Sequence, residues 1–292
     1  MSTTPTITTE VGEPRPSSLV RSSLRGVYII WYRDLLRWWR DRQRILPSLV
    51  QPVLYLFVFG VGLSSAMGGG GGAATLGVNY TTFMYPGVLT MGVLFTSMFS
   101  AMSIVWDREF GFLKEIQVAP IPRAAVAVGK ALGGSTQAIL QATLIVAMAP
   151  LAGVTVTPLM LVKVLALMFL LAFALASIGV ALASRMKTME GFQMIVNFFM
   201  MPMLFLSGAF FPLQGLPAWL SVLTHLDPAA YAVDAIRRVV LEAAGVQPEM
   251  LNSLAITGPS GAPLDIMFEA ALLVVFSAIG LFLAIRWFGE TE

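Results

Sequence analysis

Apolar residues along this 292-residue chain gather into six long runs, separated by shorter segments in which polar residues and glycine are common. The runs cover residues 45–66, 83–105, 124–149, 159–183, 192–211 and 264–288. Each run holds about the 20 residues that a helix needs to cross a hydrocarbon core of about 30 Å. The pattern predicts an all-α integral membrane protein with six transmembrane helices, whose membrane domain covers residues 46–288.

Before the first run, arginine and aromatic residues recur with a helical period on two different faces. The residues in this pattern are Trp31, Arg33, Arg37, Trp38, Arg40 and Arg44. We expect an amphipathic interfacial helix over residues 21–45, anchored in the headgroup layer, after a disordered cytoplasmic tail over residues 1–20. The chain enters the membrane directly afterwards, which favours membrane lipid over nucleic acid as the partner of this face. The helix either serves as an anchor alone or also steers a partner chain.

One charged segment, residues 106–123, interrupts the apolar pattern between the second and third runs. Each charge would cost about 2.5–3.5 kcal/mol at the centre of a bilayer, so we expect this segment to lie in water. Apolar residues at spacings of three predict a short helix, which Pro120 and Pro122 end. That helix either docks on a soluble partner or is a solvated connector. The candidate docking residues are Asp107, Arg108, Glu109, Phe110, Gly111, Leu113, Lys114 and Glu115.

Residues 212–245 are too polar for a span and too apolar for an ordinary loop. Their pattern predicts two short amphipathic helices, broken at residues 227–228, that enter the outer leaflet as a re-entrant pair before the last span. Asp234, Arg238 and Glu242 are four residues apart and can pair along one helix. His225 is the only histidine in a chain without cysteine, so we interpret it as an interfacial polar residue and predict no metal site.

A few polar side chains interrupt the spans themselves. Gln137 and Gln141 share one helical face and either bond between helices or line a polar path. Gly129 and Gly133 have the spacing that lets two helix backbones approach closely. The candidate substrate path consists of Gln137, Gln141, Asn197, Met201 and Phe205.

Composition strengthens the membrane assignment, because 57% of the residues are hydrophobic and only 12% are charged, where a soluble domain carries about 25%. Arginine and lysine gather before the first run, in the charged segment, near residue 185 and at the end of the last run. The loops at residues 68–72, a run of five glycines that we expect to lie outside, and at residues 150–158 carry none. The positive-inside rule therefore predicts that both termini are cytoplasmic, and we expect the protein in the plasma membrane.

No constellation for catalysis stands out in the sequence. The phosphate-binding pattern G-x-x-x-x-G-K-[ST] is absent, so we expect no ATPase site and no cofactor on this chain. The ionisable residues Lys130, Lys163 and Glu269 all lie near the ends of runs, and Lys130, near the inner end, can extend its ammonium out of the bundle toward water. Their positions disfavour a proton- or sodium-coupled carrier. A membrane protein that depends on energy supplied by another chain fits these observations best.

Three stretches together resemble the membrane subunit of type-2 ABC exporters, which include daunorubicin and doxorubicin resistance permeases and nodulation-factor and polysaccharide export permeases. They are residues 107–123, residues 206–217 with the continuation through Trp219 and residues 226–237, and the amphipathic helix. The resemblance covers nearly the whole chain after about residue 20.

The resemblance implies a homodimer of six-span subunits, docked on two copies of a separate ABC ATPase that binds ATP and Mg²⁺. It implies that residues 107–119 form the coupling helix on that ATPase, and that an amphiphilic substrate, drug or lipid-linked molecule leaves between the two permeases. Export of a polysaccharide or glycolipid and a non-transporting membrane scaffold are the alternatives.

Overall fold

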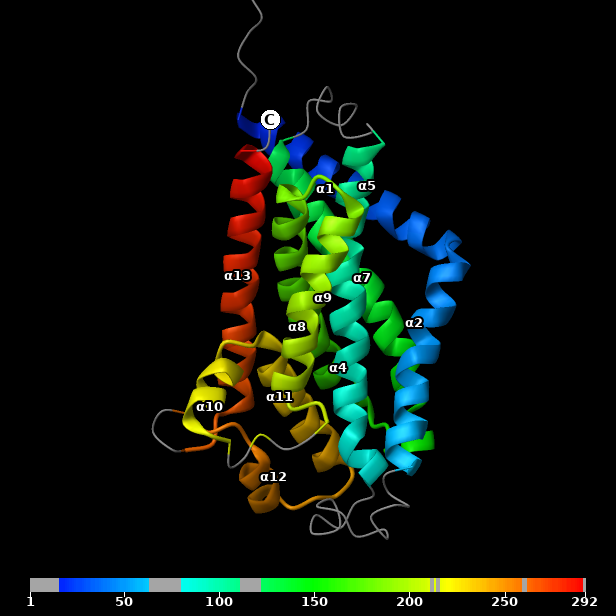
Figure 1. The fold of residues 1–292 in the computed structure, drawn as a ribbon, viewed down its shortest axis with the longest axis vertical. Coiled ribbons are helices and arrows are strands. Elements are labelled where there is room, and N and C mark those ends of the chain that lie inside the picture. The colour runs from blue at the N-terminus through cyan, green and yellow to red at the C-terminus, as the bar shows by residue number, and fades with distance from the viewer. Residues whose placement is uncertain are drawn as a thin grey trace, which may run out of the picture.

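The chain folds into helices of very different length, most of them roughly parallel to one axis (Figure 1). The computed structural model describes residues 16–62, 80–110, 122–210, 213, 216–258 and 262–290. The helices are α1 (Pro16–Arg40), α2 (Arg42–Tyr55), the π-helix η1 (Leu56–Val61), α4 (Tyr80–Ser100), α5 (Met102–Glu109), α7 (Arg123–Val146), the 3-10 helix η3 (Ala149–Ala152), α8 (Pro158–Arg185), α9 (Met189–Leu206), α10 (Ala218–His225), α11 (Pro228–Ala243), α12 (Pro248–Leu254) and α13 (Ile266–Glu290). These described ranges contain no strand, only an isolated bridge between Thr257 and Pro263.

Among the described residues, four helices are long and apolar enough to cross a membrane. They are Tyr80–Glu109, Pro158–Arg185, Met189–Leu206 and Ile266–Phe288. Helix α7 has 24 residues, enough to span a bilayer, but its lysine, glutamines and hydroxyl residues lower its hydropathy. In the first predicted run, the apolar helical part is the shorter stretch Leu46–Val58.

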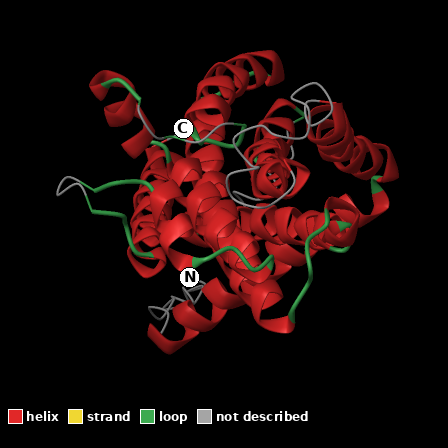
Figure 2. Cartoon of the chain, turned by 90° about the horizontal axis from the view of Figure 1, so that it is seen from below, coloured by secondary structure: helices red, strands yellow, loops and turns green. Residues whose placement is uncertain are grey.

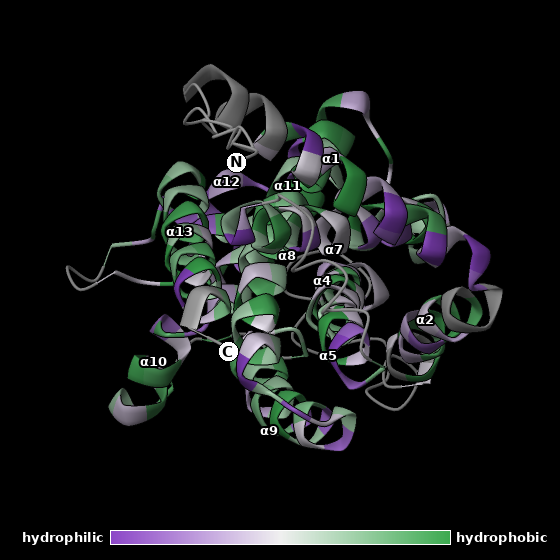
Figure 3. Ribbon diagram, turned by 90° about the horizontal axis from the view of Figure 1, so that it is seen from above, coloured by the Kyte–Doolittle hydropathy of each residue, from purple (hydrophilic) through white to green (hydrophobic). Residues whose placement is uncertain are grey.

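Helix α8 lies at the centre of the bundle, with α13 and α7 packed along it and α4 packed against both α7 and α8. The view along the bundle axis shows these helices end-on (Figure 2). Small residues permit the close packing, since a Cβ atom at Gly134 of α7 would overlap the Ser100 hydroxyl of α4. Apolar residues dominate this central group, and hydrophilic positions gather on α1 and near the end of α5 (Figure 3).

Capping residues fix where several helices begin. The Thr157 hydroxyl accepts a hydrogen bond from the Met160 amide at 3.2 Å, and the Thr188 hydroxyl accepts one from the Gly191 amide at 3.2 Å. The Asp227 carboxylate accepts one from the Ala229 amide at 2.8 Å. Each cap satisfies an amide that the first helical turn leaves without a partner, which is why α8, α9 and α11 start there.

The N-terminal boundaries differ from the sequence-based expectation. Helix α1 starts at Pro16, so residues 16–20, assigned to the tail, are helical, while residues 1–15 lie outside the described residues. The amphipathic helix also ends at Arg40, and a separate helix, α2, starts at Arg42. The chain therefore bends between α1 and α2, as Figure 1 shows at the upper right.

At the opposite end of the bundle lie α10, α11 and α12 (Figure 1). Fourteen residues of α11 are buried, because the helix packs against α8, α4 and α13. The predicted pair between Asp234 and Arg238 is present at 3.2 Å. Glu242 instead faces Lys163 of α8 at 3.5 Å, so the expected row of three does not form.

Candidate functional site

A buried ion cluster joins α1, α5 and α7 at the end of the molecule where α5 stops. The Lys130 ammonium of α7 lies 3.1 Å from the carboxylate of Asp34 on α1 and 3.1 Å from that of Asp107 on α5. It also donates to the Ser103 hydroxyl at 3.0 Å. One cation thus holds two carboxylates that come from helices distant in sequence.

Two arginines of α1 complete the cluster. Arg33 approaches Asp107 at 3.1 Å and Arg37 approaches it at 3.4 Å. The Trp31 indole donates to the Thr136 hydroxyl of α7 at 2.9 Å, which adds a second tie between α1 and α7.

Two glycines make this approach of α1 to α7 possible. A Cβ atom at Gly129 would lie 3.0 Å from the Ile30 side chain, and one at Gly133 would lie 3.3 Å from the Cβ of Asp34. The close-packing role predicted for Gly129 and Gly133 is therefore confirmed.

The burial of this cluster corrects two expectations. Asp107 was expected to lie in water and Lys130 to reach out of the bundle, but they are 3% and 4% exposed. Each buried charge would be costly alone, and the others compensate it through ion pairs and hydrogen bonds. Removal of Lys130 would leave Asp34 and Asp107 paired only with the half-exposed arginines of α1.

Arg108 fixes the end of α5 on another side. Its guanidinium donates to the Met186 carbonyl at 2.6 Å and to the Ser184 carbonyl at 2.8 Å. These oxygens belong to the C-terminal end of α8, where the carbonyls have no intrahelical donor and the helix dipole favours a cation. The end of α5 is therefore attached to α1, α7 and α8 together.

The remaining predicted docking residues divide into two groups. Glu109 and Phe110 are exposed, and Phe110 packs edge-on against the ring of Trp106. Gly111, Leu113, Lys114 and Glu115 lie outside the described residues. The fixed end of α5 thus leads directly into the segment predicted to dock on a partner.

The predicted interfacial anchors take more than one role. Arg40 is exposed, as expected for a residue facing water or lipid phosphate. Arg33 and Arg37 instead bind Asp107, while Trp38 is only 5% exposed and faces the bundle. The helix is amphipathic, but part of its polar face packs on protein because Asp107 and Lys130 supply partners there.

The five candidate path residues do not come together. Gln137 donates to the Asp34 carbonyl at 3.4 Å and Gln141 to the Ser48 carbonyl at 2.7 Å, so both bond between helices. Each also lines a cavity: Gln141 one of about 240 Å³ and Gln137 one of about 390 Å³. Asn197, Met201 and Phe205 lie on the exposed face of α9 and line neither cavity.

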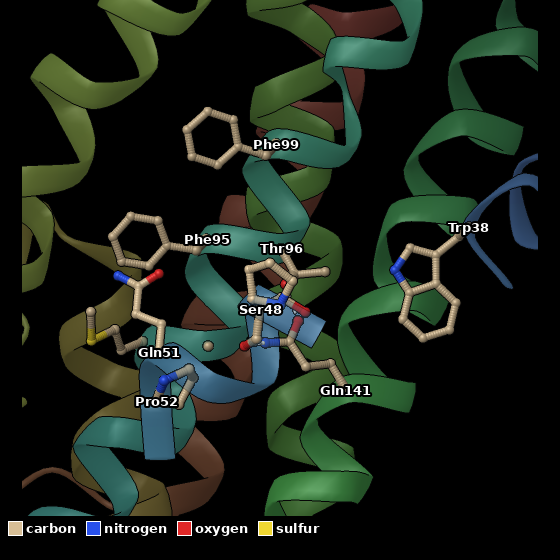
Figure 4. Close-up of a pocket in the computed structure, with 11 residues that line it drawn as sticks. Trp38, Ser48, Gln51, Pro52, Phe95, Thr96, Phe99 and Gln141 are labelled. Atoms are coloured by element: carbon tan, nitrogen blue, oxygen red, sulfur yellow. Dashed lines mark hydrogen bonds between the residues drawn. The ribbon is translucent and has the colours of Figure 1, made fainter. Parts of the chain in front are cut away.

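The smaller cavity lies between α2, α4 and α7 (Figure 4). In this view Phe95 and Phe99 extend to one side of Ser48, Thr96 and Gln141, and Trp38 extends to the other side. The Thr96 hydroxyl donates to the Gln141 amide oxygen, which fixes the amide across the cavity wall.

Sequence reasoning missed Asp34 and the role of Glu269. Asp34 is a negatively charged residue on a face of α1 that is otherwise rich in arginine. This single acidic residue was the feature of the sequence that could have indicated a buried ion pair. Glu269 is fully buried on α13 and binds Arg238 of α11, which also donates to the Leu264 carbonyl at 2.7 Å. Its position near the end of an apolar run suggested contact with water, but α11 packs against α13 and covers it.

The sequence also matches a known protein family. The sequence pattern of the family described as ABC-2 type transporter matches residues 25–241. The chain belongs to this family.

Relatives of this ABC-2 family member include a putative transport permease and nodulation proteins. It is 25% identical to "Putative transport permease ycf38" of Cyanophora paradoxa over 262 residues, which are 89% of this chain and 88% of that one. It is 30% identical to "Nodulation protein J" of Rhizobium meliloti (strain 1021) over 217 residues, 73% of this chain and 80% of the other. The Rhizobium leguminosarum bv. viciae protein of the same name is 28% identical over 215 residues, 73% of this chain and 81% of the other.

The matched region runs from α1 through nearly all of α11, so it includes the ion cluster and the end of α5. The resemblance drawn from the sequence is confirmed at the level of the family, and the protein is a membrane transport permease of the ABC-2 type.

Proposed function

We propose that this chain is the membrane-spanning subunit of an ATP-driven exporter that moves an amphiphilic small molecule, drug or lipid-linked substrate out of the cell. A separate ABC ATPase, present in two copies, binds ATP and Mg²⁺ and supplies the energy. Membership of the ABC-2 family supports this function, and so does the attachment of α5 to its neighbours.

The proposed topology has six spans with both termini in the cytoplasm of the plasma membrane. Helix α7 and the pair of α2 and η1 supply the two spans beyond the four most apolar helices. Arg33, Arg37 and Arg108 gather at one end of the bundle, which the positive-inside rule makes the cytoplasmic end. Helices α10 and α11 then form a re-entrant pair at the outer end.

The observation that carries the proposal is the double attachment of α5, through Asp107 to α1 and α7 and through Arg108 to α8. In our proposal residues 107–119 act as a coupling helix in a groove of the ATPase. A movement of this segment is transmitted to three helices at once, because a packed bundle shifts its helices as units. The two conformations differ in their affinity for substrate.

The exposed face of α9 supports a second permease copy as partner. Met194, Phe198 and Phe205 are between 56% and 73% exposed, an apolar surface that only lipid or another protein covers in a membrane. We propose a homodimer in which substrate leaves along α4 and α9 of both copies.

The chain contains no cysteine, so an introduced cysteine is its only thiol, and the reaction of that thiol shows where the residue lies. We expect F110C to form a crosslink with the ATPase when both are reconstituted and treated with a maleimide–benzophenone reagent, whose maleimide alkylates the introduced thiol and whose benzophenone reacts with C–H bonds of the adjacent protein under ultraviolet light. Phe110 is exposed at the end of α5. The matched control is M250C, at an exposed position on α12 at the opposite end of the molecule.

Membrane-impermeant maleimide gives the orientation of the same two variants. F110C is expected to react in inside-out vesicles and M250C in intact cells. Crosslinks from M250C but not F110C, or the reverse labelling pattern, would overturn the proposal.

A further inference from the structure

We propose that α10 is a lid over a cavity at its end of the bundle, and that the charge state of His225 decides whether the lid is closed. The cavity, of about 260 Å³, lies between α10 and the segment that leads to α13. A protonated His225 joins the two sides of the cavity, and a neutral His225 releases them. This inference goes beyond the proposed export function and does not depend on it.

One wall of the cavity is fixed to the bundle. Residues 256–258 and 262–264, which we call the Thr257 bridge, pair with each other through main-chain hydrogen bonds. Two buried side chains of α11 hold this bridge. The Asp234 carboxylate accepts a hydrogen bond from the amide of its first residue at 3.0 Å, and the Arg238 guanidinium donates to the carbonyl of its last residue at 2.7 Å.

Helix α10 forms the opposite wall and is only lightly attached. Of its eight residues only Thr224 is buried, and Trp219 and Val222 are 67% and 63% exposed. Figure 1 shows α10 projecting from the side of the bundle. Its polar residues Ser221, Thr224 and His225 line the cavity. A helix with so little buried surface can move without disturbing the packed core.

His225 connects α10 to the Thr257 bridge. Its Nδ1 atom lies 2.7 Å from the Ser221 carbonyl oxygen, and its Nε2 atom lies 3.1 Å from the Thr257 carbonyl oxygen. Both oxygens can only accept hydrogen bonds, so both nitrogens have to donate. A neutral imidazole carries one N–H group, and only the imidazolium ion carries two. The observed pair of contacts therefore requires a protonated ring.

The position of His225 in α10 favours the same charge state. The residue lies in the last turn of the helix, where the helix dipole stabilises a cation. The Tyr231 hydroxyl of α11 donates to the His225 carbonyl at 2.8 Å, which fixes the main chain beside the ring. When the ring is neutral and keeps its shorter bond to Ser221, a nitrogen lone pair faces the Thr257 oxygen. The contact between the two walls then becomes repulsive.

The direction of the pH response follows from this geometry. Histidine changes its charge near neutral pH. The closed lid requires the proton and the open lid does not, so the population of the closed state falls as pH rises. Acid closes the cavity, and a rise in pH opens it.

Other titratable groups lie near this contact on α11, on α13 and just before α13: Asp227, Tyr231, Asp234, Arg238, Asp265 and Glu269. Arg238 pairs with both Asp234 and Glu269. Asp227 differs, because one of its buried carboxylate oxygens has no hydrogen-bond partner among the described residues. Helix α9, which also contacts α10, carries its only charged residue, Glu190, in its first turn. Asp227 is therefore the group that the experiment has to separate from His225.

The test measures the distance between α10 and the Thr257 bridge. Because the chain has no cysteine, spin labels attach only at V222C on α10 and A262C on the bridge, both exposed positions. Double electron–electron resonance is recorded on the full-length chain in nanodiscs at about pH 5.5 and about pH 8.5, on either side of the range in which histidine changes its charge. The matched pair M250C with A262C omits α10. The ATPase is absent, so the result is independent of the proposed export function.

We expect the wild type to show one distance in acid and a second, longer distance at the higher pH. The population of the longer distance should rise at least about fivefold, which corresponds to the loss of about one hydrogen bond. H225Q cannot carry a charge and is expected to show the longer distance at both pH values. H225R keeps a cation with several N–H donors and should show the shorter distance at both. D227N should respond like the wild type, and the M250C–A262C distance should stay constant.

An unchanged distance in the wild type would overturn the proposal, and this measurement decides the matter even if a variant does not fold. A wild-type pH response in H225Q, or opening of H225R at the higher pH, would also overturn it. Loss of the response in D227N would assign the proton to Asp227 instead. A change in the M250C–A262C distance would show that the whole end of the bundle rearranges, which contradicts a lid formed by α10 alone.

Discussion

Lys130 is the residue on which the inner ion cluster depends, because its ammonium is the cation shared by Asp34 and Asp107. All three side chains are less than 10% exposed. A buried ion pair adds little net stability over an apolar replacement, but an unpaired buried charge is strongly destabilising. Replacement of Lys130 should therefore destabilise the fold more than its hydrophobic surroundings suggest.

K130M is expected to lower the free energy of unfolding by about 3–5 kcal/mol, because two carboxylates lose their shared cation. Circular dichroism during SDS titration measures the loss. K163M removes the partner of Glu242 at the surface, where an ion pair contributes about 0–1 kcal/mol. Similar losses in the two variants would contradict a structural role for the cluster.

Asp227 is a residue whose charge should depend on pH near neutrality. Burial raises the pKa of Asp227 to about 7, and the hydrogen bond from the Ala229 amide lowers it in part. The folded chain therefore binds a proton more tightly than the unfolded chain, whose aspartate has the ordinary pKa of 3.8, and the difference applies between that value and about 7. Because the folded state then holds more protons, the free energy of unfolding falls as pH rises through this window.

D227N retains an oxygen that can cap α11 but cannot titrate. We expect the variant to lose the part of the pH dependence that lies between about pH 4 and pH 7, measured as the melting temperature at several pH values in that range. Identical pH profiles for the variant and the wild type would show that Asp227 keeps one charge state in the fold.

At the scale of elements, close contact between helices and turns sets the packing. Gly87 of α4 faces the backbone of Ala209, and an added Cβ atom would overlap the carbonyl group there. Main chain cannot rotate away as a side chain can. The contact between α4 and the turn after α9 therefore requires a residue without a side chain at this position.

G87A is expected to destabilise the protein by about 1–3 kcal/mol through overpacking. G62A is the matched control, because nothing lies within 4 Å of a Cβ atom built at Gly62. The measurement is again SDS titration followed by circular dichroism. A destabilisation of G62A as large as that of G87A would point to backbone conformation and not to the contact.

The sequence predicted the long helices well where the chain is continuously apolar, as in α8, expected over residues 159–183 and observed as Pro158–Arg185. An apolar run predicts such a helix because its side chains can pack against any apolar neighbour and need no specific partner. The ion cluster was harder to predict, since Lys130 pairs with Asp34, 96 residues away. Local spacing contains no information about that partner, so Lys130 and Asp107 were assigned to water.

The whole molecule is organised with its charged attachments at one end and α10, α11 and α12 at the other (Figure 1). Between these ends, α4, α7, α8 and α13 form a densely packed unit, whereas much of α9 remains exposed. A force on the end of α5 would thus act on a rigid group of helices.

R33Q together with R37Q is expected to reduce ATP-dependent transport several-fold while ATP hydrolysis by the partner continues, because α1 would no longer be held to Asp107. Vesicle transport and phosphate release are measured in the same preparation. R40Q, which changes an exposed arginine of the same helix, should transport like the wild type. Parallel loss of transport and hydrolysis would indicate failed assembly and contradict this role.

The unequal lengths of neighbouring helices have a consequence for the surrounding lipid. Helix α9 has 18 residues and α8 has 28, which correspond to about 27 Å and about 42 Å of helical rise. A hydrophobic segment shorter than the bilayer draws the two leaflets together around it. The membrane beside α9 should therefore be locally compressed, so that a lipid-like molecule at this side has a shorter distance to travel between leaflets than it has elsewhere.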